Sequence, residues 1–142
     1  MKTYAIQKMP VKTTRRSEIV DVTDAVRQLI RRLDVKEGMA IVYVPHTTTA
    51  VTINENYDPD VKHDMLAKLD ELIPKDERYY RHNEGNSDSH VKTSLVGNSA
   101  TVLIEQADLA LGQWQGIYFC EFDGARQREI WVKVVDFKPG RD

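Results

Sequence analysis

The sequence predicts an α+β fold, in which a single compact domain spanning residues 1–142 contains mainly antiparallel β-sheet and two principal helices. Three observations support this prediction. Short segments rich in β-branched and aromatic residues recur along the chain, such as MAIVYV at 39–44 and ATVLIE at 100–105. Two longer segments space their apolar residues as helices do. The length of 142 residues suits one domain, and we find no internal repeat that would divide it.

The N-terminal part of the chain is predicted to contain two strands followed by a helix. Residues 2–9 and 17–22 alternate between polar and apolar side chains, as half-buried strands do, and the polar segment 10–16 is predicted to form the turn between them. Thr23 is a suitable N-cap for a helix that ends before Gly38. The apolar residues of this helix fall at helical spacing: Val26, Leu29, Ile30 and Leu33.

Two further strands and a well-delimited helix follow. The continuous apolar run 39–44 predicts a strand that is covered on both faces, and 50–54 predicts another strand after the polar sequence HTTT. Asp58 is a natural N-cap, and Pro59 suits the first position of the helix that it begins. Pro74 prevents that helix from continuing. Its apolar stripe consists of Val61, Met65, Leu69 and Leu72.

The C-terminal half is predicted to return to strands after a long polar stretch, 75–90. We expect a short helix, in preference to a strand, at 91–96, and a buried strand at 100–105. Residues 114–122 and 128–137 are predicted to form a hairpin around an Asp123-Gly124 turn. The helices then cover either one antiparallel sheet or two.

The composition excludes several classes of protein. A chain that is 41 % hydrophobic and 30 % charged is typical of a soluble globular protein, and a net charge of −2 gives no basic surface for nucleic acid. The longest apolar runs are too short to span a membrane, and no secretory signal is expected from the N-terminal residues, which lack a continuous apolar run. The only cysteine, Cys120, lies in the apolar run IYFCEF and is predicted to be a core residue. We therefore expect a cytoplasmic protein.

Three polar clusters are candidates for a functional site. The first, His46-Thr47-Thr48-Thr49, follows a predicted strand; its imidazole and hydroxyls could bind an oxyanion or a metal, or they could satisfy the backbone of a turn. The second begins at Asn54-Glu55-Asn56 and continues to Asp58 and Asp60, whose carboxylates could hold Mg²⁺. Helix capping already explains the two aspartates, so Glu55 is the better candidate of the three.

The third cluster is RHNEGNSDSH at residues 81–90, within the long polar stretch. His82 and His90 could supply two metal ligands if the loop folds back, and Glu84, Asn86 and Asp88 lie between them. The spacing matches no zinc motif, and a solvated surface loop is an equal alternative. The fourth histidine of the chain, at position 63, lies off the apolar stripe of its helix and is predicted to be a surface residue.

Four blocks of the sequence, in this order, closely resemble the YjbQ family, which is described as secondary thiamine-phosphate synthase-like. These blocks are HTTTAVTINEN at 46–56, DPDV at 58–61 with Asp64 after it, RHNEGNSDSHVKTSLVG at 81–97, and LGQWQGIYFCEFDGARQREIWV at 111–132. The resemblance implies a compact YjbQ-like α+β domain that assembles as a homotrimer. It also implies a polar site, near a subunit interface, that is formed by the histidine-bearing blocks.

The resemblance implies that the site draws on His46, Glu55, His82, Asn86, Asp88 and His90, and the chemistry of the side chains suggests their roles. His46, His90 and Asp88 are expected to be catalytic, and His82, His90 and Glu55 are expected to hold a divalent metal, Mg²⁺ or Zn²⁺. Gln115 is a further candidate. The residues expected to bind a phosphorylated substrate are Thr47, Thr48, Asn86, Lys92 and Arg126.

The implied activity joins a pyrimidine diphosphate to a thiazole phosphate and releases diphosphate. Such a reaction requires neutralisation of the leaving group by a metal or by cationic side chains, and free N–H groups at the start of a helix at 91–96 would add an anion site. The same pocket would also suit a metal-dependent hydrolase, in which imidazoles hold the metal. A non-catalytic trimeric protein that binds a phosphorylated ligand is a third alternative.

Overall fold

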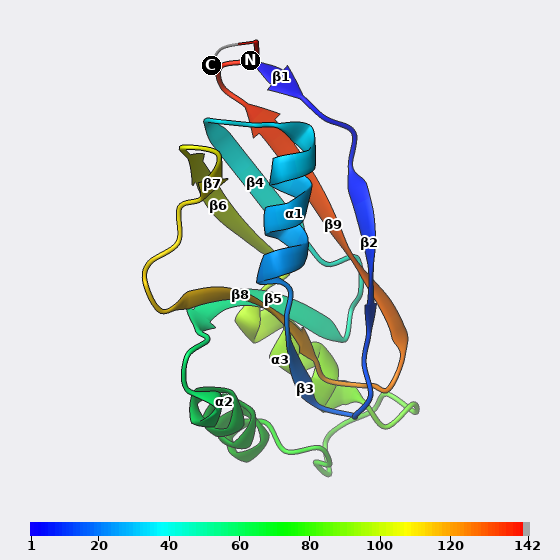
Figure 1. The fold of residues 1–142 in the computed structure, drawn as a ribbon. Coiled ribbons are helices and arrows are strands. Elements are labelled where there is room, and N and C mark those ends of the chain that lie inside the picture. Colours follow the sequence, from blue (N-terminus) through cyan, green and yellow to red (C-terminus); the bar gives the residue numbers. More distant parts are fainter. Residues whose placement is uncertain (141–142) are drawn as a thin grey trace.

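Two antiparallel sheets and three helices make up the computed structural model, which describes residues 1–140 (Figure 1). The helices are α1 (Thr23–Leu33), α2 (Pro59–Leu72) and α3 (Ser87–Val96). The strands are β1 (Lys2–Thr3), β2 (Gln7–Lys12), β3 (Glu18–Asp21), β4 (Gly38–Tyr43), β5 (Thr49–Glu55), β6 (Ser99–Glu105), β7 (Asp108–Leu109), β8 (Gln115–Glu121) and β9 (Gln127–Asp136).

The larger sheet is built around the long strand β9. Its order is β1-β9-β4-β6-β7, and β2 also pairs with β9. Alternate residues of β4, β6 and β9 point inward, so Ala40, Val102 and Val132 are buried in a core that α1 covers with Val26 and Leu29. Strand β1 pairs with the end of β9, with Lys2 opposite Asp136 and Thr3 opposite Val135, so the first and last strands lie side by side (Figure 1).

The smaller sheet lies between this core and the other two helices. Its order is β3-β8-β5, with β8 in the centre. One face of β8 contributes Ile117 and Phe119 to the first core. Its other face contributes Tyr118 and Cys120 to a second core, which α2 and α3 cover. Burial raises the pKa of the Cys120 thiol to about 12, so the prediction of a core cysteine is confirmed.

The predicted β-hairpin at 114–122 and 128–137 is wrong, because the two strands belong to different sheets. Both edges of β8 are occupied, by β3 and β5. The connection instead packs on residues 13–16: Arg126 N–H donates to Thr13 Oγ1 at 2.9 Å, and Gly124 N–H donates to the Arg16 carbonyl at 2.9 Å. A Cβ at Gly124 would collide with the backbone carbonyl oxygen of Arg15 and lie 2.8 Å from Thr13 Oγ1, so this close approach requires glycine. These contacts direct the chain into the larger sheet.

Two other boundaries differ from the prediction. Strand β2 extends to Lys12 through residues that were predicted to form a turn, and its Pro10 is tolerated because β2 pairs only with β9. Helix α3 begins at Ser87 and not at residue 91, so Asp88 and His90 lie in its first turn. Helix α2 begins as predicted: Asp58 accepts a hydrogen bond from the Asp60 N–H at 2.9 Å, and Pro59 follows it. Within residues 1–140, no helix is long and apolar enough to cross a membrane.

Candidate functional site

His46 is held against β9 immediately after β4 ends. Strand β4 stops at Tyr43, and the ring of His46 then takes the position of a strand partner for Glu129. Its Nε2 lies 3.0 Å from the Glu129 backbone nitrogen and 3.2 Å from the Glu129 carbonyl oxygen. A backbone N–H can only donate, so Nε2 accepts from Glu129, and the neutral ring carries its proton on Nδ1.

The environment of His46 favours the neutral imidazole. Burial lowers the pKa of His46 from its ordinary value of 6.5, and the positive charge of Arg128 lowers it further. The backbone of Glu129 and the carboxylates of Glu129 and Glu121 act in the opposite direction but do not outweigh these effects. At neutral pH, His46 is therefore an uncharged hydrogen-bond donor.

We expect the stability of the protein to fall as the pH is lowered below about 6.5, in part because of His46. In that range the unfolded chain binds a proton at this histidine more readily than the folded chain, so protonation favours unfolding. Urea unfolding of the wild type and of His46→Gln at pH 7.5 and at pH 5.5 measures this. The wild type should lose more stability than His46→Gln, whereas His63→Gln, an exposed histidine on α2, should behave as wild type. An unchanged pH dependence in His46→Gln would contradict the assignment.

A buried ion pair supports the threonines that follow His46. The Arg128 guanidinium donates to both oxygens of Glu121, at 2.8 Å and 2.6 Å, and to Thr48 Oγ1 at 2.8 Å. Glu121 is completely buried and also accepts from Thr13 Oγ1 at 2.8 Å. Thr48 is thus a buried partner of Arg128, while Thr47 is exposed.

Helix α3 supplies the opposite side of the site. Because the helix begins at Ser87, the residues His90, Thr93 and Ser94 are spaced so that they share one face. Gly97 ends the helix with φ +103°, a conformation that glycine adopts readily, and its carbonyl accepts from Val51 N–H at 3.1 Å. This bond fixes the end of α3 against β5.

The segment that contains His46 and Thr47 lies on one side of a polar pocket of about 490 Å³, and α3 with the two residues after it lies on the other. We call this pocket the histidine pocket. Its walls contain two imidazoles, three hydroxyls and an amide, and no charged side chain except the histidines when protonated. The Oγ1 of Thr93 is buried and has no hydrogen-bond partner within the described chain, so a donor or acceptor is unsatisfied in this wall. The lining residues are His46, Thr47, His90, Thr93, Ser94, Gly97 and Asn98.

His82 adjoins this pocket through His90. The two rings pack edge to face with their centroids 5.4 Å apart, and a smaller hollow of about 320 Å³ is lined by His82, Ser87, His90 and Val91. His90 therefore lines both hollows. Three of the four histidines of the chain, which the sequence singled out as His46, His82 and His90, lie in one continuous region.

Asp88 and Lys92 do not line either hollow. The Asp88 carboxylate is completely buried and binds Arg16 Nη2 at 3.0 Å and Lys92 Nζ at 3.1 Å. Burial raises the pKa of Asp88, but the hydrogen bonds from Arg16 and Lys92 outweigh this effect and lower the pKa below its usual range. Lys92 also binds Asp70 of α2 at 2.6 Å. These two residues, predicted to act on substrate, join α3 to its neighbours.

Asn86 and Arg126 meet at another position, around Asp123. Asn86 Nδ2 donates to Asp123 Oδ2 at 2.8 Å, and Arg126 Nη2 donates to the same oxygen at 3.1 Å. Asn86 is buried, and its Oδ1 has no partner within residues 1–140. The structure therefore places these two candidates together but outside the walls of the histidine pocket.

The structure does not bring Glu55 to the histidines. Glu55 is the last residue of β5, opposite Gln115 of β8, whereas His46 precedes the first residue of that strand. Glu55 lies six positions beyond Thr49 along the strand, which is roughly 20 Å. Within residues 1–140, no group of three His, Cys, Asp or Glu side chains is placed to hold a metal ion.

Several residues that line or support the site were not predicted as site residues: Thr93, Ser94, Gly97, Asn98, Glu121 and Arg128. Thr93, Ser94 and Asn98 were overlooked because the helix was predicted to start at residue 91; a start at Ser87 would have shown His90 and Thr93 on one face. Glu121 and Arg128 were overlooked because they are seven residues apart on strands of different sheets. A charged residue within the apolar run IYFCEF was the available signal for Glu121.

Together, fold and pocket define a class: an α+β protein in which one helix and the end of one strand enclose a pocket lined by histidine and hydroxyl side chains. A family model described as UPF0047 protein YjbQ-like matches residues 7–136. The chain belongs to the YjbQ/UPF0047 family, as its sequence blocks predicted.

The relatives support this assignment along nearly the whole chain. A UPF0047 protein of Methanocaldococcus jannaschii is 51 % identical over 92 % of this chain and 94 % of its own length. The UPF0047 protein YugU of Bacillus subtilis is 47 % identical over 92 % of this chain and 98 % of its own.

Solved structures share the fold. An uncharacterised YjbQ/UPF0047 protein of Clostridium acetobutylicum is 46 % identical and superposes with a TM-score of 0.89, covering 91 % of this chain and 99 % of that one. A protein of unknown function from Sulfolobus solfataricus is 30 % identical, with a TM-score of 0.88 and coverage of 95 % and 98 %. These relatives define a family without defining its activity.

Proposed function

We propose that the protein is an enzyme that acts on phosphorylated small molecules in the histidine pocket, with a reaction resembling that of thiamine-phosphate synthase. One observation carries the proposal: two imidazoles and three hydroxyls line a single pocket of about 490 Å³. Hydroxyl and imidazole N–H groups are suited to phosphate oxygens, and the hydroxyl residues Thr47 and Ser94 of this pocket are exposed. The cytoplasmic location expected from the sequence is part of the proposal.

The two histidines have different parts in this proposal. His46 accepts from Glu129 through Nε2, so its Nδ1–H donates to a phosphate oxygen and does not remove a proton. His90 has no hydrogen bond from its ring to the described chain and is the better candidate for proton transfer, in which the imidazolium gives its proton to an oxygen of the departing diphosphate. Thr47 and Ser94 are exposed hydroxyls on opposite walls that orient the substrate.

Neutralisation of a diphosphate requires a cation that the pocket does not supply. The basic side chains around it are already paired: Lys92 with Asp88, Arg126 with Asp123 and Arg128 with Glu121. We therefore propose that Mg²⁺ enters as part of the substrate, bound to its diphosphate. Such an ion prefers the phosphate oxygens to the neutral groups of the pocket.

We expect the purified protein to form thiamine phosphate and diphosphate from the pyrimidine diphosphate and the thiazole phosphate when Mg²⁺ is present. His90→Gln should lower the rate by about 100-fold or more, because proton transfer by a positioned side chain contributes at least that much. Arg31→Gln, an exposed change on α1, is the matched control. Product formation no faster than without enzyme would contradict the proposal. Binding of the substrates without turnover would instead favour a non-catalytic ligand-binding protein.

A metal-dependent hydrolase is the second candidate, and the contact between His82 and His90 favours it. Two adjacent imidazoles suit Zn²⁺ better than Mg²⁺, but a third ligand is needed from His46 after a movement or from another subunit. Elemental analysis of protein made without a histidine tag tests this. Stoichiometric zinc that disappears in a His82→Gln, His90→Gln double variant would support it, and metal-free active protein would exclude it.

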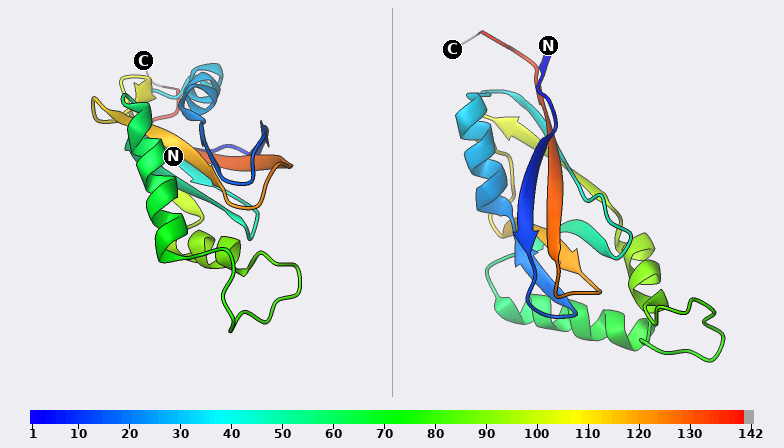
Figure 2. Two further views of the ribbon diagram at one scale, coloured as in Figure 1. Left: turned by 90° about the horizontal axis from the view of Figure 1, so that it is seen from below. Right: turned by 90° about the vertical axis from the view of Figure 1, so that its right-hand side faces the viewer.

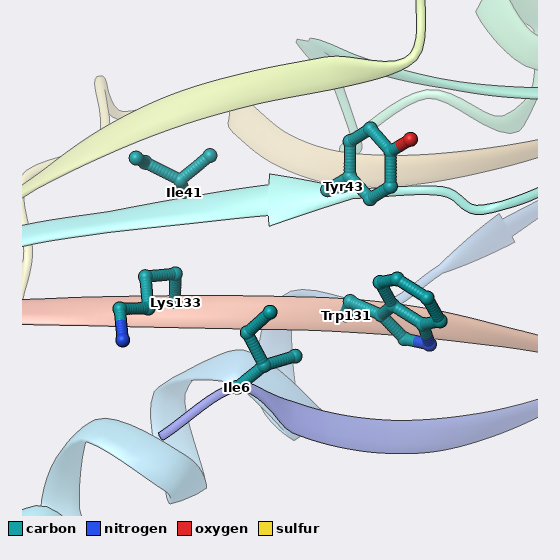
Figure 3. Close-up of a pocket in the computed structure, with 5 residues that line it drawn as sticks. All are labelled: Ile6, Ile41, Tyr43, Trp131 and Lys133. Atoms are coloured by element: carbon teal, nitrogen blue, oxygen red, sulfur yellow. The ribbon is translucent and has the colours of Figure 1, made fainter. Parts of the chain in front are cut away.

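We further propose the homotrimer that the family resemblance implies, with the outer face of the larger sheet as a contact surface. Ile41, Tyr43, Trp131 and Lys133 of β4 and β9, with Ile6 before β2, surround a hollow of about 280 Å³ on this face (Figure 3). Tyr43 and Leu103 are exposed there although they are large and apolar, which is typical of a surface that another chain covers. Sedimentation equilibrium of the wild type and of a Trp131→Glu variant measures the assembly; an unchanged mass would exclude this face.

A further inference from the structure

A second cleft lies between α2 and the start of β3. Its volume is about 620 Å³, and it shares no residue with the histidine pocket. Helix α2 lies across the end of the molecule beneath the smaller sheet (Figure 2), and none of its residues is fully buried. The helix therefore leaves a cleft on its inner side instead of packing closely on β3.

One wall of this cleft is apolar. Ile19 of β3 faces Leu66 and Ala67 of α2, and Pro59 lies at the start of the helix. Ile19 and Leu66 also belong to the second core, so the wall is a continuation of packed structure. A ligand in the cleft would thus meet a fixed apolar surface.

The charges of the cleft are unevenly compensated. Of its two acids, Asp70 binds Lys92 at 2.6 Å, whereas Glu18 accepts hydrogen bonds only from the uncharged N–H and hydroxyl of Thr14, at 2.9 Å and 3.0 Å. Its basic residues Arg15 and Lys62 form no ion pair within residues 1–140. The half-buried Lys62 has its ammonium 5.1 Å from the ring centre of Tyr118. The cleft therefore presents two cations without anionic partners.

We propose that this cleft binds a small amphipathic anion, in which one acidic group is attached to an apolar body. Arg15 and Lys62 would bind the acidic group, a carboxylate, sulfonate or phosphate, because both cations lack an anionic partner. Ile19 and Leu66 would contact the apolar body. This site is separate from the histidine pocket, and the proposal does not depend on the function proposed there.

The aromatic sulfonate 1-anilinonaphthalene-8-sulfonate is a direct probe, since it joins one anionic group to an apolar body and fluoresces when bound. We expect saturable binding to the wild-type protein. The Arg15→Gln, Lys62→Gln double variant should bind the probe at least about tenfold more weakly, because both charge-assisted contacts are lost. Ala67→Glu should also abolish binding, since it places a negative charge at an exposed position of the cleft.

Matched controls separate this site from other apolar surfaces. A Lys12→Gln, Arg31→Gln double variant removes the same two charge types at exposed positions outside the cleft and should bind as the wild type. His46→Gln with His90→Gln should also leave the binding unchanged, so failure of the proposed enzyme function would not affect this result. Circular dichroism verifies that each variant is folded. No saturable binding, or equal affinity in the wild type and the cleft variants, would overturn the proposal.

Discussion

Replacement of Arg128 by methionine is expected to lower the free energy of unfolding by about 3–5 kcal/mol, because it removes one partner of a buried ion pair. Arg128 has only 8 % of its side chain exposed, and Glu121 has none. Without Arg128, the Glu121 carboxylate loses the two hydrogen bonds from the guanidinium, at 2.6 Å and 2.8 Å, and keeps those from Thr13 Oγ1 and the Asp123 N–H. Urea unfolding at pH 7.5 measures the loss.

Two variants make this result specific. Arg126→Met removes an arginine that is 55 % exposed, and its paired Asp123 remains accessible to water, so we expect a loss of about 1 kcal/mol or less. Adding Glu121→Gln to Arg128→Met removes the unpaired buried charge and should recover part of the stability. If Arg128→Met is as stable as Arg126→Met, the buried ion pair does not stabilise the folded protein as we expect from its burial.

The same substitution should change His46. Arg128 lowers the pKa of His46 by charge repulsion, and it also holds Thr48, two residues further along. We therefore expect the pKa of His46 to rise towards 6.5 in folded Arg128→Met protein, which nuclear magnetic resonance of the imidazole reports directly. If Arg128 acted only through packing and not through its charge, the pKa of His46 would stay unchanged.

Local sequence signals predicted the elements of the fold better than their partners. Asp58 and Pro59 define the start of α2 because capping depends only on neighbouring residues. The strand pattern of β8 and β9 was equally clear, but their short connection suggested a hairpin, and pairing depends on distant residues. Thr13, more than 100 residues away, holds that connection in a different direction. A contact between residues so far apart in the sequence is not predicted by rules that consider only neighbouring residues.

The candidate site, like the fold, was predicted only in part from the sequence. The resemblance to the YjbQ family implied a site that includes His46, His82 and His90, and His46 and His90 do line one pocket. The roles of charged residues could not be inferred in the same way. Lys92 and Asp88 are suited to phosphate and to catalysis by type, yet the structure surrounds both with partners of opposite charge. Whether a charge is available to a ligand depends on tertiary contacts, which a single sequence does not show.

Replacement of Lys92 by methionine is therefore expected to act on stability, with a loss of about 3 kcal/mol in the free energy of unfolding. Lys92 is 1 % exposed and lies between Asp88, which is completely buried, and Asp70 of α2. Its removal leaves Asp88 with Arg16 as its single cationic partner and removes the ion pair between α3 and α2. Urea unfolding at pH 7.5 measures the loss.

A second variant and a change of pH distinguish this role from substrate binding. In an Asp88→Asn, Lys92→Met double variant, the remaining partners Arg16 and Asp70 can reach water, so the loss should be smaller than in Lys92→Met alone. The pKa of Asp88 is lowered in the folded protein, so its contribution to stability is present above its ordinary pKa of 3.8 and is lost as the pH falls below it. The wild type should therefore lose more stability than the double variant between pH 5 and pH 3. A Lys92→Met protein as stable as the wild type, but with weaker binding of the phosphorylated substrates, would instead place Lys92 in the pocket.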